Sequence, residues 1–104
     1  MRRPKAIEKI KDVLRTVAPA AEIILYGSEA RGESRADSDF DLLILEDVDK
    51  ISYQRRVEIE GPLFDLFLSD GIDVSPMLMT KKQWENRPFL TPFYINIINE
   101  GIRL

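Results

Sequence analysis

The sequence predicts an α/β or α+β domain in which a small mixed β-sheet is flanked by helices. Two observations predict this fold class. Apolar residues recur every three or four positions in some segments and form short β-branched runs in others, and these patterns alternate in the order α-β-α-β-α-β-α. The chain has 104 residues, which suffice for one hydrophobic core and not for a second. We therefore expect residues 1–104 to form a single domain.

The first helix and the first strand differ in the spacing of their apolar residues. The helix carries apolar residues three and four positions apart, with charged residues between them: Ile7, Ile10, Val13, Leu14 and Val17. Pro19 ends this pattern. Residues 23–26, Ile-Ile-Leu-Tyr, are typical of a short buried strand, which ends at Gly27.

A short helix from Ser28 to about Arg35 and a turn at residues 36–38 are expected before the second strand. Side chains of a strand point alternately to its two faces. One face of this strand carries Phe40, Leu42 and Ile44, and the other carries Asp39, Asp41, Leu43 and Leu45. The two carboxylates therefore lie on one face, close to the turn.

The third helix is expected between about residues 51 and 69. Its apolar side is expected to consist of Val57, Phe64, Phe67 and Leu68. Gly61-Pro62 should kink or split this helix, because proline lacks the N–H group that a helix interior uses. Residues 72–79 form the third expected strand, in which Pro76 indicates an edge, a bulge or an early end.

Two capped helices complete the chain. Thr80 and Gln83 form the pattern of a capping box before a short helix with Trp84, and Thr91-Pro92 is typical of the start of a last helix, which ends near Gly101. Aromatic residues are dense in this last third of the chain: Trp84, Phe89, Phe93 and Tyr94. They are either ordinary core residues or part of a protein interface.

The composition limits the classes of function. The sequence contains 15 Lys and Arg residues and 18 Asp and Glu residues. The resulting net charge of −3 argues against strong direct binding to nucleic acid. Cysteine is absent, which fits a cytoplasmic protein and excludes a disulfide framework. Histidine is absent too, so any bound metal should prefer oxygen ligands, as Mg²⁺ and Mn²⁺ do. The N-terminal residues do not resemble a signal peptide, and no apolar run is long enough to span a membrane.

The pair Asp39 and Asp41 is the first candidate for a metal site. Alternate residues of a strand place their Cα atoms roughly 7 Å apart on one face, so the two carboxylates can share a divalent cation. Asp73 on the third strand is a candidate third ligand, because an unpaired charge inside an apolar strand would be costly. The alternative is that Asp73 caps a turn or pairs with a lysine.

The turn before the short helix is a candidate phosphate site. Gly27 allows close approach of the backbone, Ser28 offers a hydroxyl group, and a helix start favours an anion. Arg31 and Arg35 are four residues apart, so on a helix they would share one face and could meet phosphate together. The alternative for both arginines is a surface ion pair with a nearby carboxylate.

Together these residues match a known family. Gly27-Ser28, ten intervening residues, Asp39-Phe40-Asp41 and a later strand with Asp73 resemble the nucleotidyltransferase superfamily that includes DNA polymerase β and kanamycin nucleotidyltransferase. The match is closest to the minimal nucleotidyltransferases, whose usual ending resembles residues 92–104.

The resemblance implies a role for each of these residues. Gly27 and Ser28 would bind the triphosphate, and Asp39 and Asp41 would bind two Mg²⁺ ions, or Mn²⁺ ions in their place. Asp73 would complete the ligands of the ion that activates the nucleophile. Arg31 and Arg35 would contact phosphate or a partner.

The resemblance also implies substrates and a partner. ATP or another nucleoside triphosphate would donate the nucleotide, and the partner would be an all-helical HEPN protein. The chain would then be the antitoxin that transfers AMP to a tyrosine of its toxic RNase partner. Two alternatives remain open: a binding module that blocks the partner by contact alone, and transfer to a small molecule such as an aminoglycoside in a site completed by a homodimer.

Overall fold

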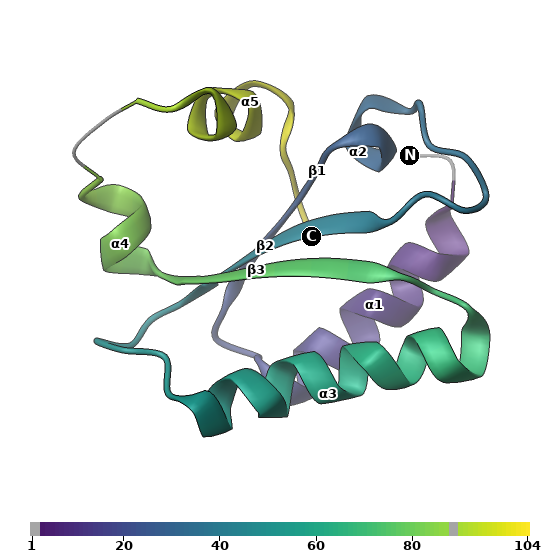
Figure 1. The fold of residues 1–104 in the computed structure, drawn as a ribbon, viewed down its shortest axis with the longest axis horizontal. Helices are drawn as coiled ribbons and strands as arrows, with labels where there is room; N and C mark the ends of the chain where they lie inside the picture. The colour runs from purple at the N-terminus through teal and green to yellow at the C-terminus, as the bar shows by residue number, and fades with distance from the viewer. Residues whose placement is uncertain (1–2, 88–89) are drawn as a thin grey trace.

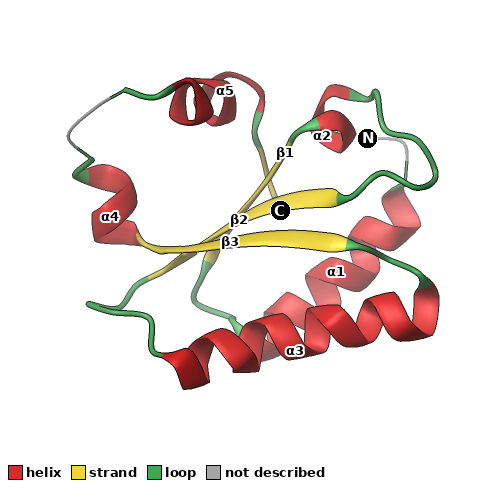
Figure 2. Ribbon diagram, viewed as in Figure 1, coloured by secondary structure: helices red, strands yellow, loops and turns green. Residues whose placement is uncertain are grey.

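The structure, a computed structural model, describes residues 3–87 and 90–104. Its elements alternate as the sequence predicts (Figures 1 and 2). In chain order they are α1 (Pro4–Val17), β1 (Glu22–Tyr26), α2 (Ser28–Arg31), β2 (Phe40–Glu46), α3 (Tyr53–Asp70), β3 (Val74–Thr80), α4 (Lys81–Glu85), α5 (Pro92–Glu100) and β4 (Ile102–Arg103). The short strand β4 was not predicted.

Within the described residues, one mixed sheet has the strand order β3-β2-β1-β4. β1 is antiparallel to β2, with Tyr26 opposite Asp41. β3 is parallel to β2, with Val74 opposite Phe40, and α3 forms the crossover between them. The end of β1 and the starts of β2 and β3 therefore meet at the same end of the sheet.

Helices cover both faces of the sheet. In Figure 1, α1 and α3 lie on one side of the strands, and α5 lies on the other. The larger core joins α1 and α3 to residues of the strands that point towards them, among them Ile10, Ile59, Phe40, Leu42 and Ile44. The smaller core on the second face consists of Ile24, Leu43, Leu45 and Ile97. The predicted alternation along residues 40–45 is confirmed.

The predicted apolar side of α3 is wrong. Ile59 and Leu63 face the core and are almost fully buried. The four residues that the sequence analysis placed on the apolar side are 46–67% exposed: Val57, Phe64, Phe67 and Leu68. This helix has two apolar sides, and the spacing of residues does not indicate which side packs on the sheet.

Gly61-Pro62 does not split α3, which runs without interruption from Tyr53 to Asp70 with Pro62 inside it. Buried Ile59 and Leu63 flank Pro62 and anchor the helix on the core on both sides of the proline. This packing offsets the hydrogen bond that proline cannot donate.

Pro76 lies on an edge strand, which confirms one of the three predicted alternatives. The backbone N–H of Phe40 donates to the Asp73 carbonyl at 2.8 Å. Alternate residues of a strand turn their backbone groups to opposite sides, so Asp73 and Ser75 face β2 and Pro76 faces the open edge. Its missing N–H group therefore costs the sheet no hydrogen bond.

Both predicted caps are confirmed. Thr80 and Gln83 form a capping box, and the Thr91 side chain accepts a hydrogen bond from the backbone N–H of Tyr94. No helix in residues 3–87 and 90–104 is both long enough and apolar enough to cross a bilayer.

Candidate active site

The sheet brings together three segments that are far apart in the sequence. Gly27 follows the end of β1, Asp39 directly precedes β2, and Asp41 is its second residue. Asp73 directly precedes β3. Pairing of Tyr26 with Asp41 and of Phe40 with Val74 fixes these segments side by side. The candidate phosphate turn and the three candidate metal ligands therefore meet at one end of the sheet.

Gly27 lies against the second aspartate of the pair. A Cβ atom on Gly27 would collide with Oδ2 of Asp41, and its φ of 77° belongs to a region that residues with a side chain rarely adopt. Ser28 follows as the first residue of α2. Only glycine therefore allows this turn to approach the carboxylate so closely.

Of the three carboxylates, Asp39 interacts with both of the others. Burial raises the pKa of Asp41, and the charge of Asp39 raises it further, while Arg31 opposes the shift. Partial desolvation raises the pKa of Asp73, and its hydrogen bond and charge interaction with Asp39 add to the shift. Ser75 on β3 donates a hydrogen bond of 2.8 Å to Oδ2 of Asp39. The site concentrates negative charge, which favours a cation.

Asp73 differs from its prediction in one respect. It lies immediately before β3 and is exposed, so it is not a charge buried inside an apolar strand, contrary to the prediction. The parallel pairing of β2 and β3 explains the position of Asp73. Its carbonyl accepts a hydrogen bond from the backbone N–H of Phe40, which places Asp73 beside Asp39 at the end of the strand pair.

The donor set suits a hard divalent cation. Among the described residues, no three acidic side chains converge closely enough to enclose an ion by themselves. Mg²⁺ usually takes one or two protein carboxylates and completes its shell with water and substrate phosphates. Asp39 and Asp41 next to a phosphate turn fit an ion that binds together with a triphosphate.

The two arginines do not share a helix face, contrary to the prediction. Gly32 has a φ of 73° and ends α2 after Arg31, so Arg35 lies in the following loop. Arg31 pairs with Glu100 at 3.2 Å and with Glu33 at 3.4 Å, as the surface-pair alternative predicts, and its contact with phosphate stays a prediction. Arg31 is also close enough to lower the pKa of Asp41.

A buried contact that was not predicted from the sequence supports the site. The guanidinium of Arg3 pairs with Glu29 at 2.8 Å, donates to the Ser38 carbonyl at 2.8 Å and stacks 3.9 Å from the centre of the Phe40 ring. Glu29 is fully buried and also accepts a hydrogen bond from Ser34. Arg3 thus joins the start of α1 to α2 and to the residues on either side of Asp39. No local sequence pattern reveals this contact, which spans 26 positions.

The aromatic residues of the last third contribute to packing inside the chain. The rings of Trp84 and Tyr94 lie 4.9 Å apart, and the guanidinium of Arg87 stacks on both. Phe93 packs edge-on against Tyr26 at 5.5 Å. Phe89 lies outside the described residues.

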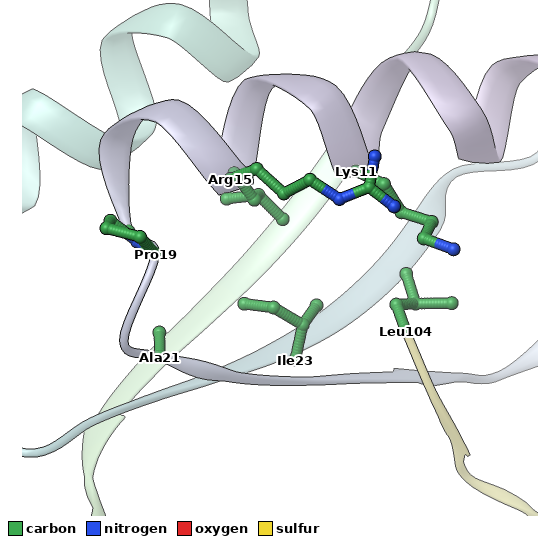
Figure 3. A pocket seen from close by; sticks show the side chains of 8 residues that line it. Lys11, Arg15, Pro19, Ala21, Ile23 and Leu104 are labelled. Carbon is green, nitrogen blue, oxygen red and sulfur yellow. The ribbon is translucent and has the colours of Figure 1, made fainter.

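A hollow of about 220 Å³ lies at a different place (Figure 3). It is formed by the C-terminal half of α1, the start of β1 and Leu104, with Lys11 and Arg15 at its rim. It contains none of the candidate site residues. The start of β1 lies at the end of the sheet remote from Gly27, so this hollow is not part of the candidate active site.

Known proteins resemble the chain over most of its length. The “Putative protein adenylyltransferase” of Methanocaldococcus jannaschii is 28% identical over 97% of this chain and 96% of its own. The crystal structure of a toxin-antitoxin with AMP-PNP matches 92% of this chain and 69% of its own with a TM-score of 0.63 and 23% identity. A structure of tri-AMPylated Shewanella oneidensis HEPN toxin in complex with MNT antitoxin matches 99% of this chain and 71% of its own, with a TM-score of 0.58 and 20% identity. These two structures support the fold.

The family follows from a match across nearly the whole chain. Residues 8–102 match the family described as Polymerase beta, Nucleotidyltransferase. The matched segment contains the glycine-serine turn and all three aspartates. The resemblance drawn from these residues is confirmed, and the chain belongs to the polymerase β-type nucleotidyltransferases.

Proposed function

We propose that this nucleotidyltransferase is a Mg²⁺-dependent protein adenylyltransferase. It would transfer AMP from ATP to a tyrosine hydroxyl of an HEPN-type partner and act as the antitoxin of a toxin–antitoxin pair, with residues 1–104 as a single catalytic domain. The observation that carries the proposal is the contact of the Gly27 turn with Asp41, next to the pair of Asp39 and Asp73. The names of the M. jannaschii relative and of the S. oneidensis complex support the acceptor and the partner.

The proposed reaction assigns a step to each part of the site. The backbone of Gly27 and Ser28 would hold the triphosphate. Asp39 and Asp41 would hold Mg²⁺, which neutralises phosphate charge and favours the deprotonated acceptor hydroxyl. A bond forms between the hydroxyl oxygen and the α-phosphorus, and the bond from that phosphorus to pyrophosphate breaks. Asp73, which interacts with Asp39 and directly precedes β3, would accept the hydroxyl proton.

The exposure of the carboxylates supports a macromolecular acceptor. Asp39 and Asp73 are both exposed. Small-molecule sites bury most of the ligand surface, whereas a tyrosine on another protein can be positioned by contacts outside the site. This observation favours transfer to a protein over transfer to an aminoglycoside.

The test is transfer itself. The chain is incubated with ATP, Mg²⁺ and an HEPN-type protein as the proposed partner, and the mass of that protein is measured. We expect the mass to increase by AMP with wild type and to stay constant with Asp39→Asn/Asp41→Asn. The matched control is Asp47→Asn/Asp49→Asn, a pair with the same spacing beyond the other end of β2. An unchanged partner mass with wild type would refute the proposed transfer.

The alternative, a binding module that blocks the partner by contact alone, predicts a different result. A binding module would neutralise the partner without its carboxylates, so Asp39→Asn/Asp41→Asn would still protect cells from the toxin. We expect the double variant to form the complex and to lose protection.

A further inference from the structure

The outward side of α3 carries an apolar surface that the described chain leaves open. Five residues on this side are 46–82% exposed: Tyr53, Val57, Phe64, Phe67 and Leu68. The other side of the same helix packs Ile59 and Leu63 into the core. Exposed apolar side chains gathered along one side of a helix indicate a binding site for another molecule.

A groove connects this surface to the candidate active site. It measures about 210 Å³ and lies between α3 and the open edge of β3. Figure 1 shows α3 running beside β3. The residues that line the groove are Glu60, Leu63, Phe64, Phe67, Asp73, Val74 and Pro76. Asp73 therefore lines the groove and also interacts with Asp39, which in turn interacts with Asp41.

We propose that this groove and the outward side of α3 are the docking surface for the protein that carries the acceptor hydroxyl. The inference rests on the proposed function, in which that hydroxyl reacts beside Asp73. The residues that flank an acceptor tyrosine must then lie on the surface next to Asp73. Val74 and Pro76 continue from Asp73 along the edge strand, at about 3.3 Å per residue. A protein that presents a tyrosine there covers the groove.

The charge and the backbone geometry of the groove determine which kind of partner surface fits it. Asp73 brings negative charge to a groove that is otherwise apolar apart from Glu60, which pairs with Arg56 at 3.6 Å. The complementary surface has apolar side chains at its centre and Lys or Arg at its rim. Pro76 offers no N–H group at the open edge of β3, so addition of a partner strand would lack a hydrogen bond there. We therefore infer that side chains of a helix or loop, rather than a strand, enter the groove.

The test compares two exposed apolar pairs of the same chain. Phe64→Ser/Phe67→Ser alters the groove, where the side chains are 59% and 46% exposed. The matched control, Ile95→Ser/Ile98→Ser, alters α5, where they are 43% and 59% exposed. The rate of AMP transfer is measured against the concentration of the HEPN-type protein. We expect the groove variant to raise the KM for this protein about tenfold or more, because apolar anchors dominate interfaces. Its kcat and its affinity for ATP should stay at wild-type values, and the control should match wild type.

Three kinetic results would overturn the inference while leaving the proposed function intact: an unchanged KM in the groove variant, a KM that rises in the α5 variant instead, or a loss confined to kcat. Thermal unfolding checks that both variants are folded. Absence of transfer by wild type would instead refute the proposed function.

A second measurement does not depend on transfer. A photo-crosslinking residue at position 64 should crosslink to the HEPN-type protein, and one at position 98 should not. Absence of a crosslink at position 64, or a crosslink there to a second copy of this chain, would overturn the docking surface. A crosslink at position 64 without AMP transfer would support docking by a non-catalytic module.

Discussion

A Cβ atom on Gly27 would collide with Oδ2 of Asp41, so the candidate phosphate turn and a candidate metal ligand lie in direct contact. The turn can approach Asp41 this closely only because Gly27 has no side chain. A side chain at position 27 would displace the carboxylate. Two residues 14 positions apart in the sequence thus act as one unit.

Gly27→Ala should therefore impair both folding and activity. The variant must adopt an unfavourable φ and displace Asp41, so we expect a loss of about 1–3 kcal/mol in the free energy of unfolding. Misplacing a reacting group can cost about 100-fold in rate, and we expect a loss of that order in AMP transfer. Urea unfolding and transfer kinetics measure the two effects.

Gly61→Ala is the control for this substitution. Gly61 lies inside α3, and a Cβ atom there meets nothing within 4 Å. Alanine should stabilise the helix by roughly 0.5–1 kcal/mol and leave transfer unchanged. Equal effects of the two substitutions would contradict the assigned contact between Gly27 and Asp41.

Asp41→Asn should stabilise the metal-free protein at neutral pH while abolishing transfer. Burial, and secondly the charge of Asp39, raise the pKa of Asp41 above its ordinary value of 3.8. The folded protein then holds the proton more tightly than the unfolded chain, so the ionised carboxylate lowers stability as the pH rises through the folded-state pKa. We therefore expect the midpoint of thermal unfolding to be higher in the variant than in wild type at pH 7.

This gain should shrink as the pH falls towards 3.8, because the wild-type carboxyl is then protonated too. Asp37→Asn removes an exposed carboxylate in the loop before β2 and serves as the control. A variant that is less stable than wild type at pH 7 would mean that the Asp41 carboxylate makes a net favourable interaction in the metal-free protein.

The fold follows from the sequence where the pattern is local. Phe40, Leu42 and Ile44 alternate with Leu43 and Leu45 because a strand has a period of two, and that period is visible in adjacent residues. The side of α3 was predicted wrongly because both sides of this helix are apolar. Which side becomes buried depends on α1 and the sheet, and these contacts are not encoded in the spacing within α3.

The candidate site, too, was predicted where the sequence pattern is local and not where it depends on contacts between distant residues. Gly27, Asp39, Asp41 and Asp73 are found from their spacing, because a turn and two strand starts place them at one end of the sheet. The length of α2 was overestimated because Gly32 adopts a left-handed conformation and ends the helix. Ser75 and Arg3 were missed because their contacts depend on strand register and on packing across 26 or more positions.

Removing the metal should abolish nucleotide binding as well as transfer. We expect calorimetry to detect ATP binding to wild type with Mg²⁺ and none after EDTA, because Asp39 and Asp41 alone would repel the triphosphate. Mg²⁺ and ATP together should raise the free energy of unfolding by about 2–3 kcal/mol at a hundredfold excess over Kd. Asp39→Asn/Asp41→Asn should lose both effects, whereas Asp47→Asn/Asp49→Asn should keep them.

If the isolated chain binds no ATP, the measurement is repeated on the complex with the HEPN-type protein. Binding only in the complex would mean that the partner completes the nucleotide pocket. Binding that survives in Asp39→Asn/Asp41→Asn would contradict the assignment of these two carboxylates.

Arg3→Met should lower stability and weaken the site through the loop before Asp39. Glu29 would keep its hydrogen bond from Ser34 but lose the buried guanidinium, at a cost of about 2 kcal/mol. Loss of the hydrogen bond to the Ser38 carbonyl and of the stack on Phe40 should free the backbone that positions Asp39. We therefore expect a lower affinity for Mg²⁺ with ATP, in addition to the lower midpoint of unfolding.

A double-mutant cycle separates these two effects. Arg3→Met/Glu29→Gln removes the buried charge together with its partner, so the loss of stability should be smaller than the sum of the two single losses. The weakened affinity for Mg²⁺ with ATP should persist in the double variant, because Arg3 no longer holds Ser38 and Phe40. If affinity recovers together with stability, the contribution of Arg3 is the ion pair with Glu29 alone, and the loop before Asp39 keeps its geometry without the guanidinium.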